Sequence, residues 1–328
     1  MSNAKPAVEI SVVIATYRQP ALLQNVLNRL SEQIFDQKKF EVIVLEGGNC
    51  EKTKQVVESF EPKIRNIKLI LKKQCSLSES RDIGFSIARG EIIAITDDDT
   101  IPNKNWLEKI SESFKKNPSA LGIEGKITSG KISSLFTKAP VNSFGKQYIG
   151  CNTHYRKKVL KEINGHDPEF DFWREDTNIA FKVLEKGEIV FDPSVIVHHP
   201  PKEVNPMSVI YNLKYLNDDW KLWKRFPKRT TLFAFRDWFK NFVSSFISYA
   251  TLFFFLFFFP DVQLMGYILI LSFLIRFLLS MQNKDNSIME YFQFFSLVTL
   301  RGLLYPFAFF GYFIVNLFFT HNKEQKCV

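Results

Sequence analysis

The sequence predicts an α/β domain with a mostly parallel sheet, followed by helices that span a membrane. Three observations predict this. Short apolar runs alternate with helical stretches from Glu9 to about Pro200, as in sheets that helices cover on both faces. Several of these runs end in polar or glycine-rich residues. The 34 Phe residues of the 328-residue chain crowd toward its C-terminal third, which indicates segments meant for lipid.

Four apolar runs predict strands, and the segments between them predict helices. We expect strands over residues 10–15, 40–45, 67–71 and 91–96. Proline fits the first turn of a helix and glycine its end, so helices are expected over 20–30, 53–60 and 78–88, with Ser78 or Ser80 as the cap of the last. Ligands of such sheets gather at the carboxyl ends of the strands. A binding cleft is therefore expected there.

Three apolar runs predict membrane attachment, over residues 242–259, 264–281 and 303–319. Each is long enough to cross or nearly cross the hydrocarbon layer. Arg301 and Pro306 leave the third run open as a spanning, tilted, kinked or re-entrant segment. The resulting division is an α/β domain over 1–205, a basic and aromatic interfacial segment over 206–241, two to three transmembrane helices over 242–320, and a polar tail over 321–328.

The net charge of +9 predicts an anionic partner. Lys and Arg residues gather between 214 and 240, just before the first apolar run, so the expected partner is a cytoplasmic membrane leaflet. No nucleic-acid motif accompanies them, and no nucleic acid is expected. The four Cys residues lack paired spacing, and the first ten residues lack the apolar core of a signal peptide. We therefore expect a multi-pass membrane protein whose α/β domain is cytoplasmic.

Three adjacent carboxylates, Asp97, Asp98 and Asp99, follow the fourth strand. Such neighbours repel one another unless a cation or solvent relieves them. In an extended chain Asp97 and Asp99 face one way and Asp98 the other, so the outer two can address one ion. Oxygen ligands of this kind suit Mg²⁺ or Mn²⁺ on a diphosphate. The alternative is an acidic, solvated turn.

Two further clusters are candidates for chemistry. Glu175 and Asp176 open a predicted helix, where carboxylates either satisfy the helix dipole or, for Asp176 in particular, accept a proton from an attacking hydroxyl. His198 and His199 follow another apolar run. Either imidazole can complete a metal shell begun by Asp99, or both are ordinary exposed side chains.

Four motifs together resemble family 2 glycosyltransferases. They are Ser11-Val-Val-Ile-Ala-Thr-Tyr17, Ser80-Arg-Asp-Ile-Gly84, Ile95-Thr-Asp-Asp-Asp-Thr-Ile-Pro-Asn-Lys-Asn-Trp-Leu107 and Arg174-Glu-Asp-Thr-Asn178. Their order and spacing cover roughly residues 9–201. The resemblance implies the GT-A fold, a nucleotide-sugar donor, a divalent metal (Mn²⁺ or Mg²⁺) and inversion at the anomeric carbon of the sugar.

The resemblance also implies roles for single residues. Six residues are implied at the nucleotide-sugar donor. Thr16, Tyr17 and Glu46 would lie at the base, Arg81 near the phosphates and Asp97 near the ribose, and Asp98 belongs to the same donor site. Asp99 and His199 are the implied metal ligands, and Asp176 is the implied base with Glu175 beside it. The acceptor side is formed by Gly150, Cys151, Asn152 and Trp173.

Two departures from the family pattern limit these expectations. The second strand ends in Glu46-Gly47, where the family often has two acidic residues, which leaves the identity of the base open. No QxxRW run follows Asp176, so we expect transfer of single sugars to an acceptor that is lipid-linked or part of an envelope glycan. Two alternatives stay open. One is a non-catalytic protein that keeps a sugar-nucleotide fold, and the other is a nucleotidyltransferase, although no glycine-rich basic loop follows the first strand.

Overall fold

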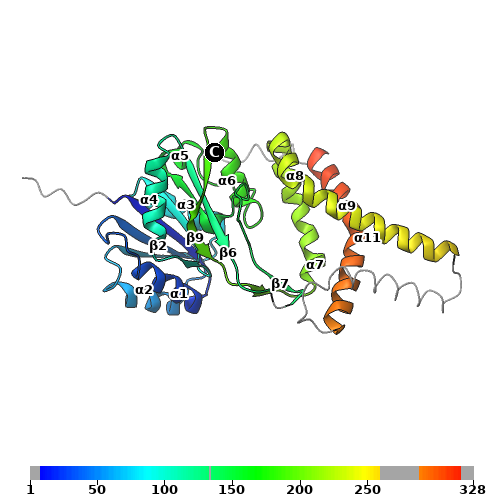
Figure 1. Cartoon of the computed structure of the whole chain (residues 1–328), viewed down its shortest axis with the longest axis horizontal. Helices are drawn as coiled ribbons and strands as arrows, with labels where there is room; N and C mark the ends of the chain where they lie inside the picture. Colours follow the sequence, from blue (N-terminus) through cyan, green and yellow to red (C-terminus); the bar gives the residue numbers. More distant parts are fainter. Residues whose placement is uncertain (1–7, 133, 259–287, 319–328) are drawn as a thin grey trace, which may run out of the picture. The chain divides into compact units, whose positions relative to one another are not determined.

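The computed structural model describes residues 8–132, 134–258 and 288–318. The chain divides into two compact units (Figure 1), Met1–Gly130 with Ala139–Pro201 and Lys131–Lys138 with Lys202–Val328. The expected α/β domain over 1–205 does not set residues 131–138 apart, whereas the structure assigns them to the second unit. Each unit is described by itself below.

The first unit is built on one sheet of eight strands in the order β3-β2-β1-β4-β8-β6-β9-β5. The strand β8 runs antiparallel to β4 and β6, and β5 runs antiparallel to β9, while the other pairs are parallel. This confirms the predicted α/β class with a mostly parallel sheet. The strands are β1 (Ile10–Thr16), β2 (Phe40–Glu46), β3 (Ile67–Leu71), β4 (Ile92–Asp97), β5 (Ile101–Pro102), β6 (Gly122–Thr128), β8 (Thr153–Arg156) and β9 (Ile189–His198).

Helices cover both faces of this sheet because successive strand residues point to opposite faces. Val12 and Ile14 of β1 pack in a core with α1 (Pro20–Ser31), α2 (Glu51–Phe60) and α4 (Trp106–Lys116). Val13 packs in a second core with α3 (Leu77–Ile87), α5 (Lys157–Glu162) and α6 (Glu175–Leu184). The nearly continuous apolar sequence of β1 is thus explained by burial on both sides.

The ends of the helices follow from local sequence. Pro20 stands in the first turn of α1, where its missing N–H costs nothing. The cap of α3 is Ser76, whose side chain accepts a hydrogen bond from the Glu79 N–H at 3.2 Å. The expectation of Ser78 or Ser80 as cap is therefore wrong. The helix begins at Leu77, one residue earlier than expected, so the cap is the preceding Ser76.

The second unit contains a short antiparallel pair of strands and several helices. The strands are β7 (Thr137–Lys138) and β10 (Lys202–Glu203). The helices are α7 (Ser208–Tyr211), the 3₁₀ turn η2 (Asn212–Tyr215), α8 (Leu216–Arg225), α9 (Pro227–Phe258) and α11 (Ile288–Phe318). Aromatic rings join α8 to α11: the Trp220 ring lies 4.6 Å from the rings of Phe309 and Phe313, and its Nε1–H donates to the Phe309 carbonyl at 2.7 Å.

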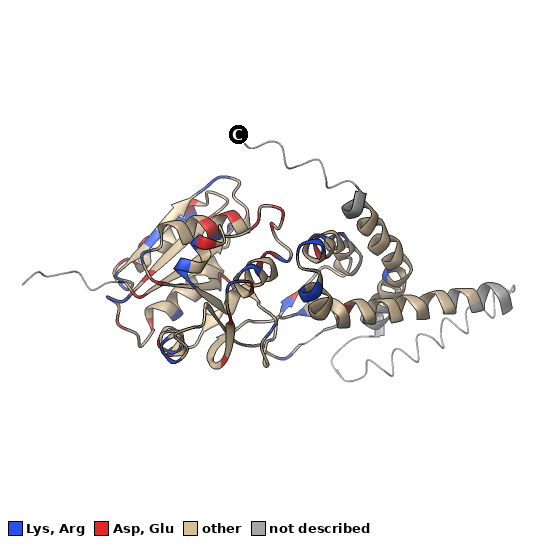
Figure 2. Ribbon diagram, turned by 90° about the horizontal axis from the view of Figure 1, so that it is seen from above, with Lys and Arg blue, Asp and Glu red and all other residues tan. Residues whose placement is uncertain are grey.

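One stretch of the described residues, Ser296–Val315 in α11, is long and apolar enough to cross a membrane, with a mean hydropathy of 1.5. Figure 2 shows that α9 and α11 carry few charged residues along most of their length. The expected run over 303–319 overlaps this stretch, and most of the run over 242–259 forms the end of α9. The run over 264–281 lies outside the described residues. A multi-pass arrangement is therefore not supported by the part of the chain that the structure covers.

Candidate active site

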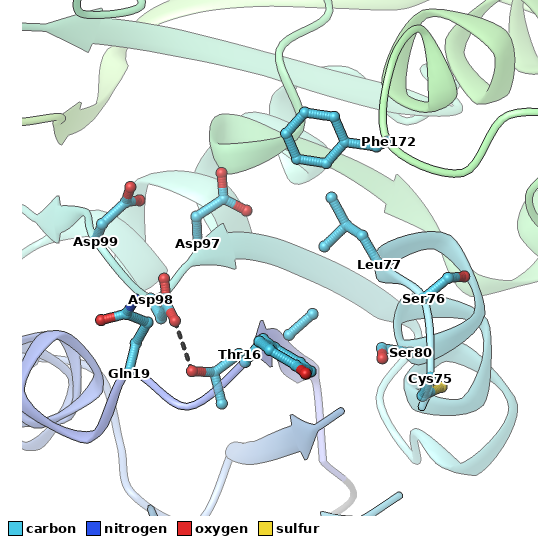
Figure 3. Close-up of a pocket in the computed structure, with 12 residues that line it drawn as sticks. Thr16, Gln19, Cys75, Ser76, Leu77, Ser80, Asp97, Asp98, Asp99 and Phe172 are labelled. Carbon is cyan, nitrogen blue, oxygen red and sulfur yellow. Dashed lines mark hydrogen bonds between the residues drawn. The ribbon is translucent and has the colours of Figure 1, made fainter. Parts of the chain in front are cut away.

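A pocket of about 430 Å³ opens at the carboxyl ends of β1 and β4. These strands are neighbours, with Ala15 paired to Asp97, so the residues that follow each strand meet at one edge of the sheet. Figure 3 shows Thr16 and the three aspartates around this pocket, with Phe172 on the far side of it from Thr16. The residues that line it are Ala15, Thr16, Tyr17, Gln19, Cys75, Ser76, Leu77, Ser80, Asp97, Asp98, Asp99 and Phe172.

The three adjacent aspartates have different neighbours. The Asp98 carboxylate accepts a hydrogen bond from the Thr16 hydroxyl at 2.5 Å (Figure 3). Asp97 Oδ1 lies 2.8 Å from Arg81 Nη2, and Asp99 Oδ1 lies 3.4 Å from His199 Nε2. Burial, and next the charges of Asp176 and Asp99, still raise the pKa of Asp97, against the opposing effect of Arg81. The different neighbours also set Asp98 apart from the outer two, as the alternation of side chains predicts.

Pairing of β5 with β9 brings His199 to Asp99. Ile101 is paired with His198 across the two antiparallel strands, and both the His199 and Asp99 side chains are about 10% exposed. The His199 Nδ1 atom lies 3.0 Å from the Pro200 carbonyl, which favours a proton on Nδ1 and leaves Nε2 to face Asp99. His198 instead has its Nδ1 atom 3.3 Å from the Thr128 hydroxyl. Of the two imidazoles, His199 is therefore the one placed at the aspartates.

Asp99 and His199 fit a divalent cation that is bound partly by the protein and partly by a substrate. One carboxylate oxygen and one imidazole nitrogen suit Mn²⁺ or Mg²⁺. Across residues 8–132, 134–258 and 288–318, no three His, Cys, Asp or Glu side chains are placed to form a metal shell on their own. Mg²⁺-type sites commonly take one or two protein ligands and complete their shell with water and phosphate oxygens. The Asp99–His199 pair matches that type of site.

Arg81 of α3 connects the aspartates to α6. Its Nη1 atom lies 2.7 Å from Asp176 Oδ1 and 3.5 Å from Glu175 Oε1, while its Nη2 atom lies 2.8 Å from Asp97 Oδ1. The Arg81 side chain is only 2% exposed. Burial lowers the pKa of Arg81, but the charges of Asp176, Asp97 and Glu175 outweigh it and raise this pKa above its ordinary value. The guanidinium therefore stays charged and holds carboxylates from two distant motifs together.

Gly150 holds the second oxygen of Asp176. The Gly150 N–H donates to Asp176 Oδ2 at 2.7 Å, from the 3₁₀ turn η1 (Gly150–Asn152). A Cβ at position 150 would lie 2.3 Å from Asp176 Oδ1, so no larger residue fits without moving the carboxylate. The sequence predicted a small residue here for the approach of a sugar. The observed close approach is to Asp176 itself.

Glu175 and Asp176 have different surroundings although they are adjacent. The Glu175 side chain is 7% exposed and that of Asp176 is 24% exposed. Burial, and next the Asp176 charge, raise the pKa of Glu175 to about 9, against the opposing effect of Arg81. Glu175 is thus protonated at neutral pH. A buried carboxyl group whose pKa is raised beside a charged partner is typical of active sites.

Three predicted site residues are buried away from the pocket. Glu46 is fully buried, and its Oε1 atom accepts hydrogen bonds from the backbone N–H groups of Arg18 and Gly48 at 3.1 and 2.7 Å. Cys151 and Asn152 are 1% and 0% exposed. None of the three is among the residues that line the pocket, and their roles toward a ligand stay predictions. Glu46 instead joins the loops that follow β1 and β2.

Two predicted aromatic residues lie at the surface. Tyr17 lines the pocket and is 57% exposed, as a residue that stacks on a ligand needs to be. Trp173 is 37% exposed and is not among the residues that line the pocket, and the Arg174 guanidinium lies 5.1 Å from the centre of its ring. The acceptor-side role of Trp173 stays a prediction.

Several residues that line the pocket were not predicted from the sequence. Cys75, Ser76 and Leu77 follow β3, so the rule that ligands lie at strand ends offered a signal for them. Phe172 gives no such signal. It comes from the loop before α6 and is 64% exposed. Its place in the pocket depends on tertiary contacts of that loop.

Residues 11–129 match the family model described as Glycosyl transferase family 2. Among curated proteins, glycosyltransferase AglE of Haloferax volcanii is 29% identical over 101 residues, which are 30% of this chain and 33% of that protein. The chain spans between about a third and about half of the length of the first curated relatives it matches.

Solved structures agree in fold. The mannosyltransferase PcManGT from Pyrobaculum calidifontis, in complex with GDP-Man and Mn²⁺, superposes with a TM-score of 0.63 at 14% identity, over 94% of this chain and 87% of that chain. TarS residues 1–349 from Staphylococcus aureus, in complex with UDP-GlcNAc, gives a TM-score of 0.50 at 20% identity, over 64% and 66%. With the ordered motifs and the eight-stranded sheet, residues 11–129 are identified as a glycosyl transferase family 2 domain.

Proposed function

We propose that this chain is an inverting glycosyltransferase that moves a sugar from a nucleotide-sugar donor to a hydroxyl acceptor. The observation that carries the proposal is the meeting of two acidic motifs on one buried guanidinium, one of which, Asp97 to Asp99, also lines the pocket. Arg81 joins Asp97, at the carboxyl end of β4, to Asp176, at the start of α6. The structural relatives in complex with UDP-GlcNAc and GDP-Man support a nucleotide-sugar donor.

The donor occupies the pocket at the carboxyl ends of β1 and β4. Tyr17 is exposed enough to stack on the base, and Asp97 contacts the ribose. Arg81 acts through the carboxylates, because its guanidinium is buried and both terminal nitrogens already contact Asp97 and Asp176. Its role is to fix the distance between the donor site and Asp176 rather than to bind phosphate directly.

Asp99 and His199 are the residues that hold a divalent cation. When bound, such a cation neutralises the negative charge that develops on the diphosphate leaving group. Two observations support a cation at this place. Asp99 and His199 offer one oxygen and one nitrogen ligand, and the Pro200 carbonyl favours the His199 tautomer whose Nε2 is free of a proton.

Asp176 is the base. It takes the proton of the acceptor hydroxyl as that oxygen attacks the anomeric carbon from the face opposite the leaving group. Each carboxylate oxygen has two lone pairs, and Arg81 and the Gly150 N–H occupy one on each. A lone pair therefore stays available for the acceptor. Glu175 is protonated at neutral pH and serves as a hydrogen-bond donor beside the base. A positioned base contributes about 10²–10⁴-fold to such a rate.

The acceptor is a lipid-linked sugar or part of an envelope glycan. The apolar stretch Ser296–Val315 supports attachment to a membrane, and an acceptor confined to that membrane reaches a high effective concentration. The catalytic unit then stands on the cytoplasmic side, as the basic residues between 214 and 240 favour.

A donor screen tests the proposal. The detergent-purified chain is incubated with UDP- and GDP-sugars and Mn²⁺ or Mg²⁺, and released nucleoside diphosphate is measured. We expect turnover of at least one donor that depends on the cation and falls by 100-fold or more in Asp99→Asn, about the size of a lost electrostatic group in an active site. Binding of a donor without any turnover would instead support the non-catalytic alternative.

A further inference from the structure

The loop of residues 167–174, named the strap here, carries Phe172 into the pocket. It connects the turn at Gly165-His166 to α6. Within it Phe170 is fully buried, whereas Phe172 is 64% exposed and lines the pocket. The strap is thus anchored in its middle and presents an aromatic face to whatever the pocket holds.

Asp82 holds the beginning of the strap. Both of its carboxylate oxygens accept the His166 backbone N–H at 3.0 Å, and Oδ1 lies 2.7 Å from His166 Nδ1. The His166 ring is 2% exposed and stacks on Phe85 at 5.5 Å. Gly165 has φ +60°, and a Cβ there would lie 2.5 Å from Asp82 Oδ1. The chain can come this close to Asp82 only because residue 165 is glycine.

Arg81 holds the end of the strap through Asp176 and Glu175. Two consecutive residues of α3 therefore fix both ends of an eight-residue loop. The α3 helix is itself packed tightly on the sheet, because a Cβ at Gly84 would lie 2.5 Å from Val13 Cγ1. The position of the strap therefore depends on α3, which is itself held by its packing against β1.

We propose that Asp82 is a positioning residue. Through His166 it holds the strap in the position in which Phe172 contacts the bound nucleotide sugar. The proposal rests on the proposed function, since it needs a donor in the pocket. Asp82 does not line that pocket, so it acts only through the strap. The aromatic face of Phe172 offers a large apolar contact to a sugar ring or a base. A strap released at its beginning must be ordered again when the donor binds, and that cost weakens binding.

Calorimetric titration of the detergent-purified full chain tests this, with UDP-GlcNAc and GDP-mannose as probes in the presence of Mn²⁺. We expect Asp82→Ala to weaken binding about fivefold, the size of one lost hydrogen bond. Asp82→Asn keeps an acceptor for the His166 N–H and should stay within about twofold of wild type. Asp36→Ala is the matched control, because Asp36 is exposed and also accepts a backbone N–H, that of Lys38 at 2.9 Å.

A double-mutant cycle with Phe172→Ala decides whether Asp82 acts through the strap. We expect Asp82→Ala to have no further effect once Phe172 is absent. Should Asp82→Ala fail to fold, His166→Phe replaces it in the same cycle. This change keeps a ring beside Phe85 and removes only the bond from Nδ1 to Asp82.

The outcomes separate the two proposals. Equal weakening in the presence and absence of Phe172, or no weakening at all, overturns the role of Asp82 while a donor still binds to the wild type. If the wild type binds neither these two probes nor any donor of the screen above, the proposed function fails, and the role of Asp82 fails with it.

Discussion

Gly150 shows how one missing side chain shapes the site. Its N–H holds Asp176 Oδ2, and a Cβ in its place would lie 2.3 Å from the other carboxylate oxygen. Contacts this short force the flexible partner to move, and here that partner is the proposed base. The glycine is therefore required by the position of Asp176 and not by any turn of the backbone.

Gly150→Ala should lower kcat by 10- to 100-fold, roughly the cost of misplacing a catalytic group by about 1 Å. The thermal midpoint should fall as well, because a displaced Asp176 leaves the buried Arg81 guanidinium with one partner fewer. The measurement is steady-state release of nucleoside diphosphate. Gly130→Ala is the control, since a Cβ there meets Pro201 at an ordinary 3.5 Å. Unchanged kcat in Gly150→Ala would contradict the assignment of Asp176.

Glu175 should make stability depend on pH. Its pKa is raised to about 9, from an ordinary value of 4.5. Between these values the folded state holds a proton that the unfolded state has released, so stability falls as pH rises. Below pH 4.5 both states are protonated and the stabilising contribution is fully present.

Glu175→Gln mimics the protonated acid and should remove this fall. Relative to wild type, its thermal midpoint should therefore rise progressively from pH 5 to pH 9, measured on the detergent-solubilised chain. Glu162→Gln alters an exposed glutamate of α5 that pairs with Lys158 at 3.8 Å, and its effect should be small at every pH. A constant difference between Glu175→Gln and wild type would show that Glu175 is ionised throughout.

At the scale of elements, the sequence predicted what local patterns encode. Short apolar runs with turn signals located β1 to β4, because a strand buried on both faces needs a continuous apolar run. The ends of those strands located Thr16, Tyr17 and Asp97 to Asp99. The same patterns did not separate the antiparallel strand β8, because the direction of a strand is set by its partners and not by its own sequence.

Contacts between distant elements were beyond the sequence. Arg81 was expected at the phosphates, and only the packing of α3 against α6 reveals its pairing with Asp176. Glu46 was expected at the base and Asn152 in the acceptor-side loop, and in the structure both side chains satisfy buried backbone groups. The same residue types occur as buried polar side chains and as ligand-binding side chains. Only their hydrogen-bond partners in the folded structure distinguish the two.

Asn152 connects four elements and should matter for stability. Its Oδ1 atom accepts from Trp106 Nε1 at 2.9 Å, and its amide donates to the carbonyls of Lys126 and Val195 at 2.9 and 3.0 Å. Asn152→Ala leaves these buried groups without partners and should lower the free energy of unfolding by about 3 kcal/mol. Urea unfolding measures it, with Asn28→Ala on the exposed side of α1 as control. A loss below about 0.5 kcal/mol would show that water replaces the amide.

At the scale of the whole molecule, the second unit should attach the chain to a membrane. The stretch Ser296–Val315 has 20 residues, and a helix of that length measures about 30 Å, the thickness of the hydrocarbon layer. The chain should stay in the membrane pellet after alkaline carbonate extraction and be released by detergent. Recovery in the carbonate supernatant would show that α11 packs inside the protein instead.

The account as a whole depends on Asp176 acting as the base at a pocket that other residues build. Asp176→Asn keeps one oxygen acceptor, for either Arg81 or the Gly150 N–H, and removes the negative charge. The decisive measurement compares donor affinity and sugar transfer in this variant and in wild type. We predict donor binding within about threefold and transfer reduced by 10²-fold or more. Transfer at the wild-type rate with Asn at position 176 would contradict the account.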